Sequence, residues 1–234
     1  MTSYYFSLVV ALGTCFTAEA GGWNEIEESV SHQVFSFQVV NADTEGRDQI
    51  IQEVLVLQNS LIVDNSTTTE LPLQFEENGF LTIRMKPEGV LQVLLEGGKI
   101  ITARCQDQLV GYLILSELGN YFSWLSRAHQ VEIDLKLSVM ELEQYYIDTQ
   151  IKILEQIAVA TAYAKQGIGK QLVNMAKQLA PHGLSTDILY RPFTNHASFA
   201  FFSKQGFVPI CRVYVIGRPP KCILHEIWVE LWQG

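Results

Sequence analysis

The sequence predicts an α/β domain whose central sheet is mixed, largely antiparallel and flanked by helices. Strand-like and helical patterns follow one another as strand, helices, hairpin, strand, helix, strand, helix and hairpin. The 234 residues are 48% hydrophobic, which is enough for one sizeable core. A glycine-rich turn at 163–170 joins a strand to a helix near the middle of this pattern. We therefore predict one domain at 33–234, preceded by an arm or linker at 1–32.

The charge balance and the cysteines restrict the class of protein. The formal net charge of −9 argues against nonspecific nucleic-acid binding, so we expect no nucleic-acid partner. None of the four cysteines forms a CxxC pair or a cluster with histidine, so we predict no metal site. Unpaired thiols in a reducing compartment are the simplest interpretation, which favours a cytoplasmic location. In the alternative interpretation, Cys211 and Cys222 face each other across a hairpin near the end of the sequence.

The N-terminal segment leaves three interpretations open. Residues 4–16 are mostly apolar but too few for a comfortable membrane span. Ala18-Glu19-Ala20 resembles a signal-peptidase site, although no Lys or Arg precedes the apolar run. The segment is a packed arm, a signal-like segment or the result of a start codon placed too early. No other segment predicts a membrane span, so we expect no membrane partner.

The first half of the chain predicts a strand, two helices and a hairpin. A half-buried strand is expected at 33–40, and the polar cluster 41–44 suits a helix cap. The helix that follows carries Ile50, Val54 and Leu57 on one face and ends near Asn59. Further expectations are a loop at 64–70, a short strand at 80–85, a helix from Pro87 with Leu91, Leu94 and Leu95 on its apolar face, and hairpin strands at 99–105 and 109–115.

The second half predicts the elements around the glycine-rich turn. Residues 119–150 are the least regular and include a helix that carries Leu135, Val139 and Leu142. This segment forms a substrate pocket or ordinary packed structure. Beyond it we expect a strand at 153–159, a helix that buries Ile168, Leu172, Ala176 and Leu179, a strand at 187–191, a short helix after Asn195, and strands at 207–216 and 223–232 joined by the turn 217–220.

The glycine-rich turn predicts an anion site. Backbone N–H groups at the start of a helix have no partner inside the helix, and the helix dipole adds partial positive charge. Gly167 and Gly169 would let an anion approach the backbone closely. The alternative is a glycine turn that serves only close helix–strand packing. We expect the turn to hold a pyrophosphate.

Two segments of the chain carry residues at the spacing of known signatures. The first is Ile157-Ala158-Val159, followed after five residues by 165–170. The second is Asn195-His196-Ala197-Ser198 with 201–207, which reads as an Asn-x-x-Ala helix that ends in Gly-Phe, with Ser198 in the Ala position. The first resembles the acetyl-CoA-binding signature of the GNAT N-acetyltransferases, and the second resembles another signature of that family. The core motifs therefore lie at 151–207. The resemblance implies a GNAT fold whose sheet is splayed at the acyl-CoA site, between strands that end near Val159 and Tyr190. A Rossmann-type nucleotide site is disfavoured because Leu172 stands where a third glycine is needed.

The resemblance also implies site residues and an activity. The activity is transfer of an acetyl group from acetyl-CoA to a primary amine of a small molecule or a protein, by direct attack in a ternary complex. The expected partners are acetyl-CoA and an unidentified amine, and a homodimer is an alternative to a monomer. The implied cofactor-binding residues are Ile157, Ala158, Val159, Lys165, Gln166, Gly167, Ile168, Gly169, Lys170 and Asn195.

The expected acid and base are less well defined than the cofactor site. Glu155 shares strand alternation with Ile157 and Val159, and as a partly buried carboxylate it is the candidate general base. A solvated or lysine-paired Glu155 is the alternative. The family often carries Tyr as a general acid where this chain has Phe202, which has no proton to give. Tyr163, Tyr190 and Ser198 are the substitutes. A catalytically silent acyl-CoA-binding module is therefore the rival hypothesis.

Overall fold

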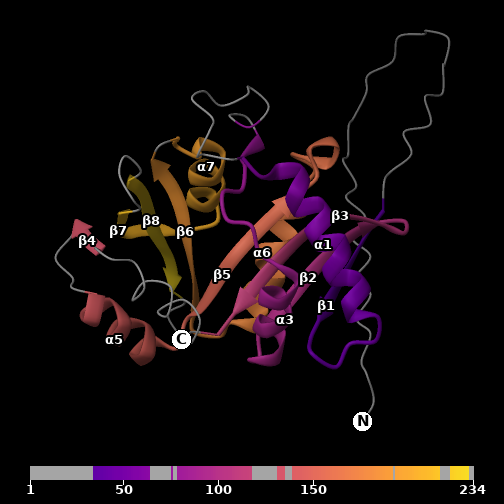
Figure 1. The fold of residues 1–234 in the computed structure, drawn as a ribbon, viewed down its shortest axis with the longest axis horizontal. Helices are drawn as coiled ribbons and strands as arrows, with labels where there is room; N and C mark the ends of the chain where they lie inside the picture. Colours follow the sequence, from indigo (N-terminus) through magenta and orange to yellow (C-terminus); the bar gives the residue numbers. More distant parts are fainter. Residues whose placement is uncertain are drawn as a thin grey trace, which may run out of the picture.

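One mixed sheet forms the centre of the molecule (Figure 1). The computed structural model describes residues 34–63, 75, 78–117, 131–134, 139–191, 193–216 and 222–231. Within these residues eight strands pair in the order β1-β2-β3-β5-β6-β8-β7-β4. Only β5 and β6 run parallel, and every other neighbouring pair is antiparallel. The predicted mixed, largely antiparallel sheet is confirmed.

The elements follow the chain in nearly the predicted order. The strands are β1 Phe35–Val40, β2 Lys99–Cys105, β3 Gln108–Ser116, β4 Val131–Asp134, β5 Lys152–Val159, β6 Gly183–Arg191, β7 Val208–Ile216 and β8 Cys222–Leu231. The helices are α1 Arg47–Leu61, α3 Pro87–Leu95, α5 Val139–Thr149, the 3-10 turn η1 Thr161–Tyr163, α6 Ile168–Leu179 and α7 His196–Lys204. The predictions at 1–32, 64–70 and 217–220 lie outside the described residues.

Helices cover both faces of the sheet and create two apolar cores. In Figure 1, α1 and α3 lie in front of the strands and α6 lies behind them. The α6 face buries Ile168, Leu172 and Ala176, as their helical spacing predicts, against β2, β3 and β5. The α1 face buries Val54 and Leu94 against Ile114 and neighbouring side chains. The sheet therefore separates two chemically similar layers, and its interior strands are buried on both faces.

The predicted cap of α1 is wrong. Asn41 Oδ1 accepts hydrogen bonds from the Asp43 N–H and the Thr44 hydroxyl, so these side chains close a turn of their own. The helix begins later, at Arg47, after Gly46 in a left-handed conformation with φ 73°. It also ends at Leu61, two residues beyond the predicted end. The polar cluster thus stabilises the turn that leaves β1 and does not cap the helix.

The short strand predicted at 80–85 is also wrong. Only Leu81 makes a bridge, to Ile62, and the rest of the segment has no ladder. Buried amide side chains replace it. Gln58 donates to the Met85 carbonyl and accepts from the Met85 N–H, and Gln156 donates to the Ile83 carbonyl. The apolar spacing of this segment reflects its packing at the edge of the α1 core rather than sheet pairing.

Two smaller predictions, on α3 and on the late cysteines, are also decided by the structure. Leu95, predicted on the apolar face of α3, is 60% exposed, and Val90 and Val93 are buried instead. In the β7–β8 ladder Cys211 lies opposite Ile227 and Cys222 lies opposite Ile216, so the two cysteines do not face each other. None of the described helices has the length and apolar character that a membrane crossing requires.

Candidate functional site

The parallel strands β5 and β6 separate near the middle of β5. Their pairing is limited to three positions, the last of which joins Leu154 to Thr186. At this point the Thr186 hydroxyl donates a 3.1 Å hydrogen bond to the Leu154 carbonyl and so satisfies a backbone acceptor at the fork. Beyond Leu154, β5 pairs with β3 alone. The predicted splay is therefore present, and it leaves one edge of β5 open.

A cavity of about 450 Å³ fills the space between the separated strands. Its walls come from six segments: the end of α1 at Leu61, the stretch 78–83, β5 at 154–159, the turn at 163–170, β6 at 186–189, and α7 with the residues around it. Ile168 belongs to the core on the α6 face, whereas Leu61 belongs to the core on the α1 face. Because both line the cavity, it reaches from one face of the sheet to the other.

The glycine-rich turn closes one end of this cavity. Gly167 precedes α6 with φ 84°, and Lys165 also has a positive φ of 62°. No side chain caps the helix, so its first N–H groups have no partner from a capping residue. Ile168, Gly169 and Lys170 line the cavity at this helix start. The turn therefore offers backbone donors, a helix dipole and two lysines to an anion.

The two glycines of the turn are favoured for different reasons. A Cβ on Gly167 would meet nothing within 4 Å, so the left-handed backbone favours glycine there and packing does not. A Cβ on Gly169 would lie 3.2 Å from the Phe201 ring, which is a tight contact, so close packing against α7 favours glycine there. Close packing, the alternative interpretation of the turn, therefore accounts for Gly169 but not for Gly167.

Glu155 is the extra residue of a β-bulge at the fork. Ile114 pairs with Gln156 and Leu115 pairs with Leu154, so Glu155 has no partner in the β3 ladder. Glu155, Ile157 and Val159 still alternate with buried neighbours, and all three line the cavity. Its Oε1 accepts a 2.6 Å hydrogen bond from the Ser116 hydroxyl. The lysine-paired alternative does not hold, because Lys152 pairs with Glu117 at 2.7 Å.

The surroundings of Glu155 raise its pKa above the ordinary value of a glutamate in water. Burial raises its pKa to about 6, the Ser116 hydrogen bond opposes the rise, and the charge of Asp187 on β6 adds to it. A carboxyl group with this pKa is mostly ionised at neutral pH and can still accept and release a proton readily. Burial thus gives Glu155 the properties expected of a general base.

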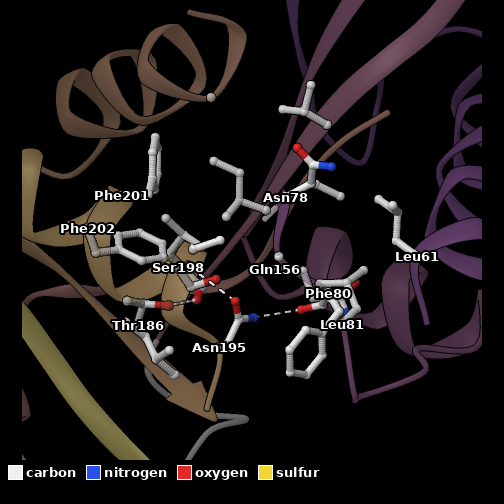
Figure 2. A pocket seen from close by; sticks show the side chains of 18 of the residues that line it. Leu61, Asn78, Phe80, Leu81, Gln156, Thr186, Asn195, Ser198, Phe201 and Phe202 are labelled. Atoms are coloured by element: carbon white, nitrogen blue, oxygen red, sulfur yellow. Dashed lines mark hydrogen bonds between the residues drawn. The ribbon is translucent and has the colours of Figure 1, made fainter. Parts of the chain in front are cut away.

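Asn195 has a structural role in addition to lining the cavity. Its Oδ1 accepts from the Ser198 N–H and caps α7, and its Nδ2 donates to the Phe80 carbonyl at 2.9 Å. Figure 2 shows Asn195 between Phe80 and Ser198. The side chain is 5% exposed. It therefore joins α7 to the stretch 78–83, a role that the sequence pattern did not predict.

The position expected to hold a general acid is occupied by a packed phenylalanine. Phe202 is 2% exposed, and its ring contacts Phe201 and Phe207 edge to face. Of the substitutes, Tyr163 and Ser198 line the cavity, whereas Tyr190 is not among the described lining residues. The Tyr163 hydroxyl donates to Gln108 at 3.4 Å and its ring packs on Phe35. Tyr163 and Ser198 are therefore the two substitutes that the structure leaves at the cavity.

Most of the predicted site residues come together around this cavity. Those that line it are Glu155, Ile157, Ala158, Val159, Lys165, Gly167, Ile168, Gly169, Lys170 and Asn195. Gln166 is exposed and is not among the described lining residues. The sequence pattern missed Gln156 on β5 itself. It also missed Ser116, Thr186, Asp187 and the stretch 78–83, which the fold brings in from β3, from β6 and from the α1–α3 connection. Among the described residues, no cluster of His, Cys, Asp or Glu could hold a metal ion.

Comparisons with known proteins give a family for this arrangement. Residues 96–209 match the family model described as "Acetyltransferase (GNAT) domain". A search of curated proteins finds no match. The solved structures that resemble the chain share little sequence with it, so they show the fold alone.

Three of these structures indicate the extent of the likeness. NAA60 from Arabidopsis thaliana, in complex with acetyl-CoA, is 13% identical; 85% of this chain covers 99% of that chain with a TM-score of 0.52. The ribosomal-protein-S18-alanine N-acetyltransferase from Escherichia coli is 10% identical, with 85% and 96% covered and a TM-score of 0.50. An acetyltransferase from Bacillus anthracis str. Ames, in complex with acetyl coenzyme A, is 19% identical with a TM-score of 0.41, and this chain spans 62% of its length.

Proposed function

This chain carries an acetyltransferase domain of the GNAT family, and on that premise we propose that it is an acetyl-CoA-dependent N-acetyltransferase. It transfers the acetyl group to a primary amine by direct attack in a ternary complex. One observation carries the proposal: the cavity between β5 and β6 joins an anion-binding helix start to a buried carboxylate with a raised pKa. These are the two requirements of the reaction, a cradle for coenzyme A phosphates and a proton acceptor for the amine.

The residues of the donor end fit coenzyme A. The N–H groups from Lys165 to Lys170 bind the pyrophosphate, and the two lysines add positive charge. The open edge of β5 at Ile157 and Val159 offers backbone groups to the amides of the pantetheine arm, as an added strand would use them. An N–H on this edge also polarises the thioester carbonyl. Ala158 contributes only backbone, because its side chain is buried on the α1 face.

Glu155 performs the proton transfer in this proposal. It takes a proton from the ammonium, directly or through water, and the freed nitrogen pair attacks the thioester carbon. The carbon–sulfur bond then breaks, and the electron pair leaves with the sulfur as the thiolate of coenzyme A. The nitrogen, which becomes cationic on attack, gives its second proton to water and is left as the neutral amide. Phe202 cannot protonate that thiolate. The thiolate leaves unprotonated and takes its proton from solvent.

A catalytically silent acyl-CoA-binding module is the second candidate, and Phe202 is the observation that favours it. Its ring is buried among Phe201 and Phe207 and offers no proton. The donor end of the cavity suits both candidates equally. They therefore differ in turnover and not in cofactor affinity.

Two measurements test the proposal. Isothermal titration with acetyl-CoA is expected to show saturable binding at one site, and its absence at high cofactor concentration overturns both candidates. A free-thiol assay of coenzyme A release, run over a panel of primary amines, is expected to show amine-dependent turnover. Binding without release on any amine favours the silent module. A cytoplasmic location and a homodimeric state remain predictions from the sequence.

A further inference from the structure

The cavity has two ends of opposite charge. Lys165 and Lys170 are the only Lys or Arg among the described lining residues, and both belong to the turn before α6. At the fork, Glu155 on β5 and Asp187 on β6 line the cavity, and their charges interact. The cationic end suits phosphates, whereas the fork suits an ammonium group.

Beyond the fork, toward the α1 face, four apolar side chains line the cavity together with Asn78, Thr82 and Gln156. We call this part the apolar wall and define it as Leu61, Phe80, Leu81 and Ile83. Figure 2 shows Leu61, Phe80 and Leu81 on the side of the cavity opposite the Phe201 and Phe202 rings. Leu61 and Phe80 are each 7% exposed, whereas Ile83 is 46% exposed. Ile83 therefore contributes the most accessible apolar surface of the wall.

Buried amides hold this wall in place although it has no secondary structure. Asn195 binds the Phe80 carbonyl at 2.9 Å, and Gln156 binds the Ile83 carbonyl at 2.6 Å. Gln156 is in turn held by the Tyr112 hydroxyl at 3.0 Å. A wall tied to α7 and to β5 is preformed, so a ligand does not have to order it on binding.

From this arrangement we propose that the fork and the apolar wall form the acceptor subsite, and that the acceptor is a protonated primary amine with an apolar group close to its nitrogen. The inference rests on the proposed function, which places coenzyme A at the α6 end and leaves the α1 end to the amine. Acidic amines do not fit, because no described Lys or Arg lines this end. Polyamines do not fit either, because the second charge would lie against the apolar wall.

Two kinds of molecule can carry a primary amine close to an apolar group: free amines and the N-termini of peptides. The test separates these two kinds of acceptor. One arm titrates ethylamine, butylamine, isoamylamine and phenylethylamine, with ethanolamine and 1,4-diaminobutane as polar counterparts. The other arm titrates tetrapeptides that differ only in a first residue of Leu, Phe, Gly or Lys. Each is added to the full chain saturated with coenzyme A, and binding is measured by calorimetry, so that turnover is not needed. If coenzyme A does not bind, the same titrations are run on the free protein.

The expected result is a rise in affinity with apolar size, by about fourfold for each buried methylene, in at least one arm. Ile83→Ser is expected to weaken the apolar ligand by roughly fivefold and to leave coenzyme A binding unchanged. Val56→Ser is the matched control, because Val56 is 71% exposed on α1 and is not among the described lining residues. Equal affinity for polar and apolar ligands, a preference for diamines, or no amine binding overturns the inference. Failure of the proposed function appears separately, as absent acetyl-CoA binding or absent thiol release.

Discussion

The hydroxyl of Ser116 donates a 2.6 Å hydrogen bond to Oε1 of Glu155, at the β-bulge in the β3–β5 ladder. Both residues lie at the point where β5 and β6 begin to separate. Burial raises the pKa of Glu155 to about 6, and this hydrogen bond restrains the rise because it favours the ionised carboxylate. Ser116 therefore helps to set the pH at which the proposed base becomes active.

Replacing Ser116 by Ala is expected to raise the pKa of Glu155 above its value in the parent protein. The proposed base must be ionised to accept a proton, so the acid limb of the rate profile moves to higher pH. Carboxyl titration by carbon NMR measures the same pKa without turnover. Ser60→Ala is the control, since the Ser60 hydroxyl donates to the Leu57 carbonyl in α1. An unchanged NMR pKa in Ser116→Ala contradicts the assigned role.

Replacing Glu155 by Gln is expected to stabilise the fold at neutral pH while it removes the proposed base. A carboxyl whose folded pKa lies above its ordinary value of 4.5 binds more protons when folded. Its contribution to stability is complete below about pH 4.5 and is lost as the pH rises through about 6. The loss amounts to at most about 2 kcal/mol, which the neutral Gln avoids. Urea denaturation at pH 5 and pH 8 measures the difference.

Glu117→Gln is the matched control for that measurement. Glu117 is close in sequence to Ser116, and its carboxylate pairs with Lys152 at a side-chain exposure of 44%. An exposed pair contributes about 0–1 kcal/mol, so its loss is expected to lower stability slightly or to leave it unchanged. A Glu155→Gln protein that is less stable than the parent at pH 8 contradicts the account of its desolvation.

The sequence was sufficient for seven of the eight described strands, for the helix α6 and for the glycine-rich turn, whereas it did not predict β4. These features depend on local patterns: alternation in β5, helical spacing in α6, and glycines where the backbone turns. Gly167 illustrates the point, because its φ of 84° is a property of one residue and its neighbours. The pair of signatures at 157–170 and 195–207 predicted a resemblance to the GNAT family, and residues 96–209 match the model of that family.

The acceptor end could not be predicted in the same way, because its parts come from distant segments. Asn195 and Phe80 are 115 residues apart, and Gln156 and Ile83 are 73 residues apart. The spacing of apolar residues at 80–85 predicted a strand, although the backbone there binds amide side chains. The bulge at Glu155 is equally invisible in sequence, since it depends on the register with β3.

A carboxylate at Gly167 is expected to abolish coenzyme A binding. In Gly167→Asp the new side chain projects where a Cβ meets nothing within 4 Å, beside the N–H groups of α6, and its charge repels phosphate. Titration with coenzyme A measures the loss. Gly167→Asn is the matched control, because Asn has the same shape and also tolerates a positive φ but carries no charge. Gly167→Asp binding coenzyme A as Gly167→Asn does would show that the pyrophosphate lies elsewhere.

Gln156 and Gln58 allow the acceptor end to be tested apart from stability. Gln156→Leu removes the partners of the Tyr112 hydroxyl and the Ile83 carbonyl, and Gln58→Leu removes the two bonds to Met85. Each leaves two polar groups without their partner, at a cost of about 2–4 kcal/mol in the free energy of unfolding.

The two variants differ in their distance from the cavity. Gln156 and Ile83 line the cavity, whereas Gln58 and Met85 are not among its described lining residues. Gln156→Leu is therefore expected to raise the KM for the amine severalfold with little change for acetyl-CoA, and Gln58→Leu to change neither. If Gln156→Leu and Gln58→Leu are equally destabilised and have the same KM for the amine, the hydrogen bond from Gln156 to the Ile83 carbonyl does not shape the acceptor end.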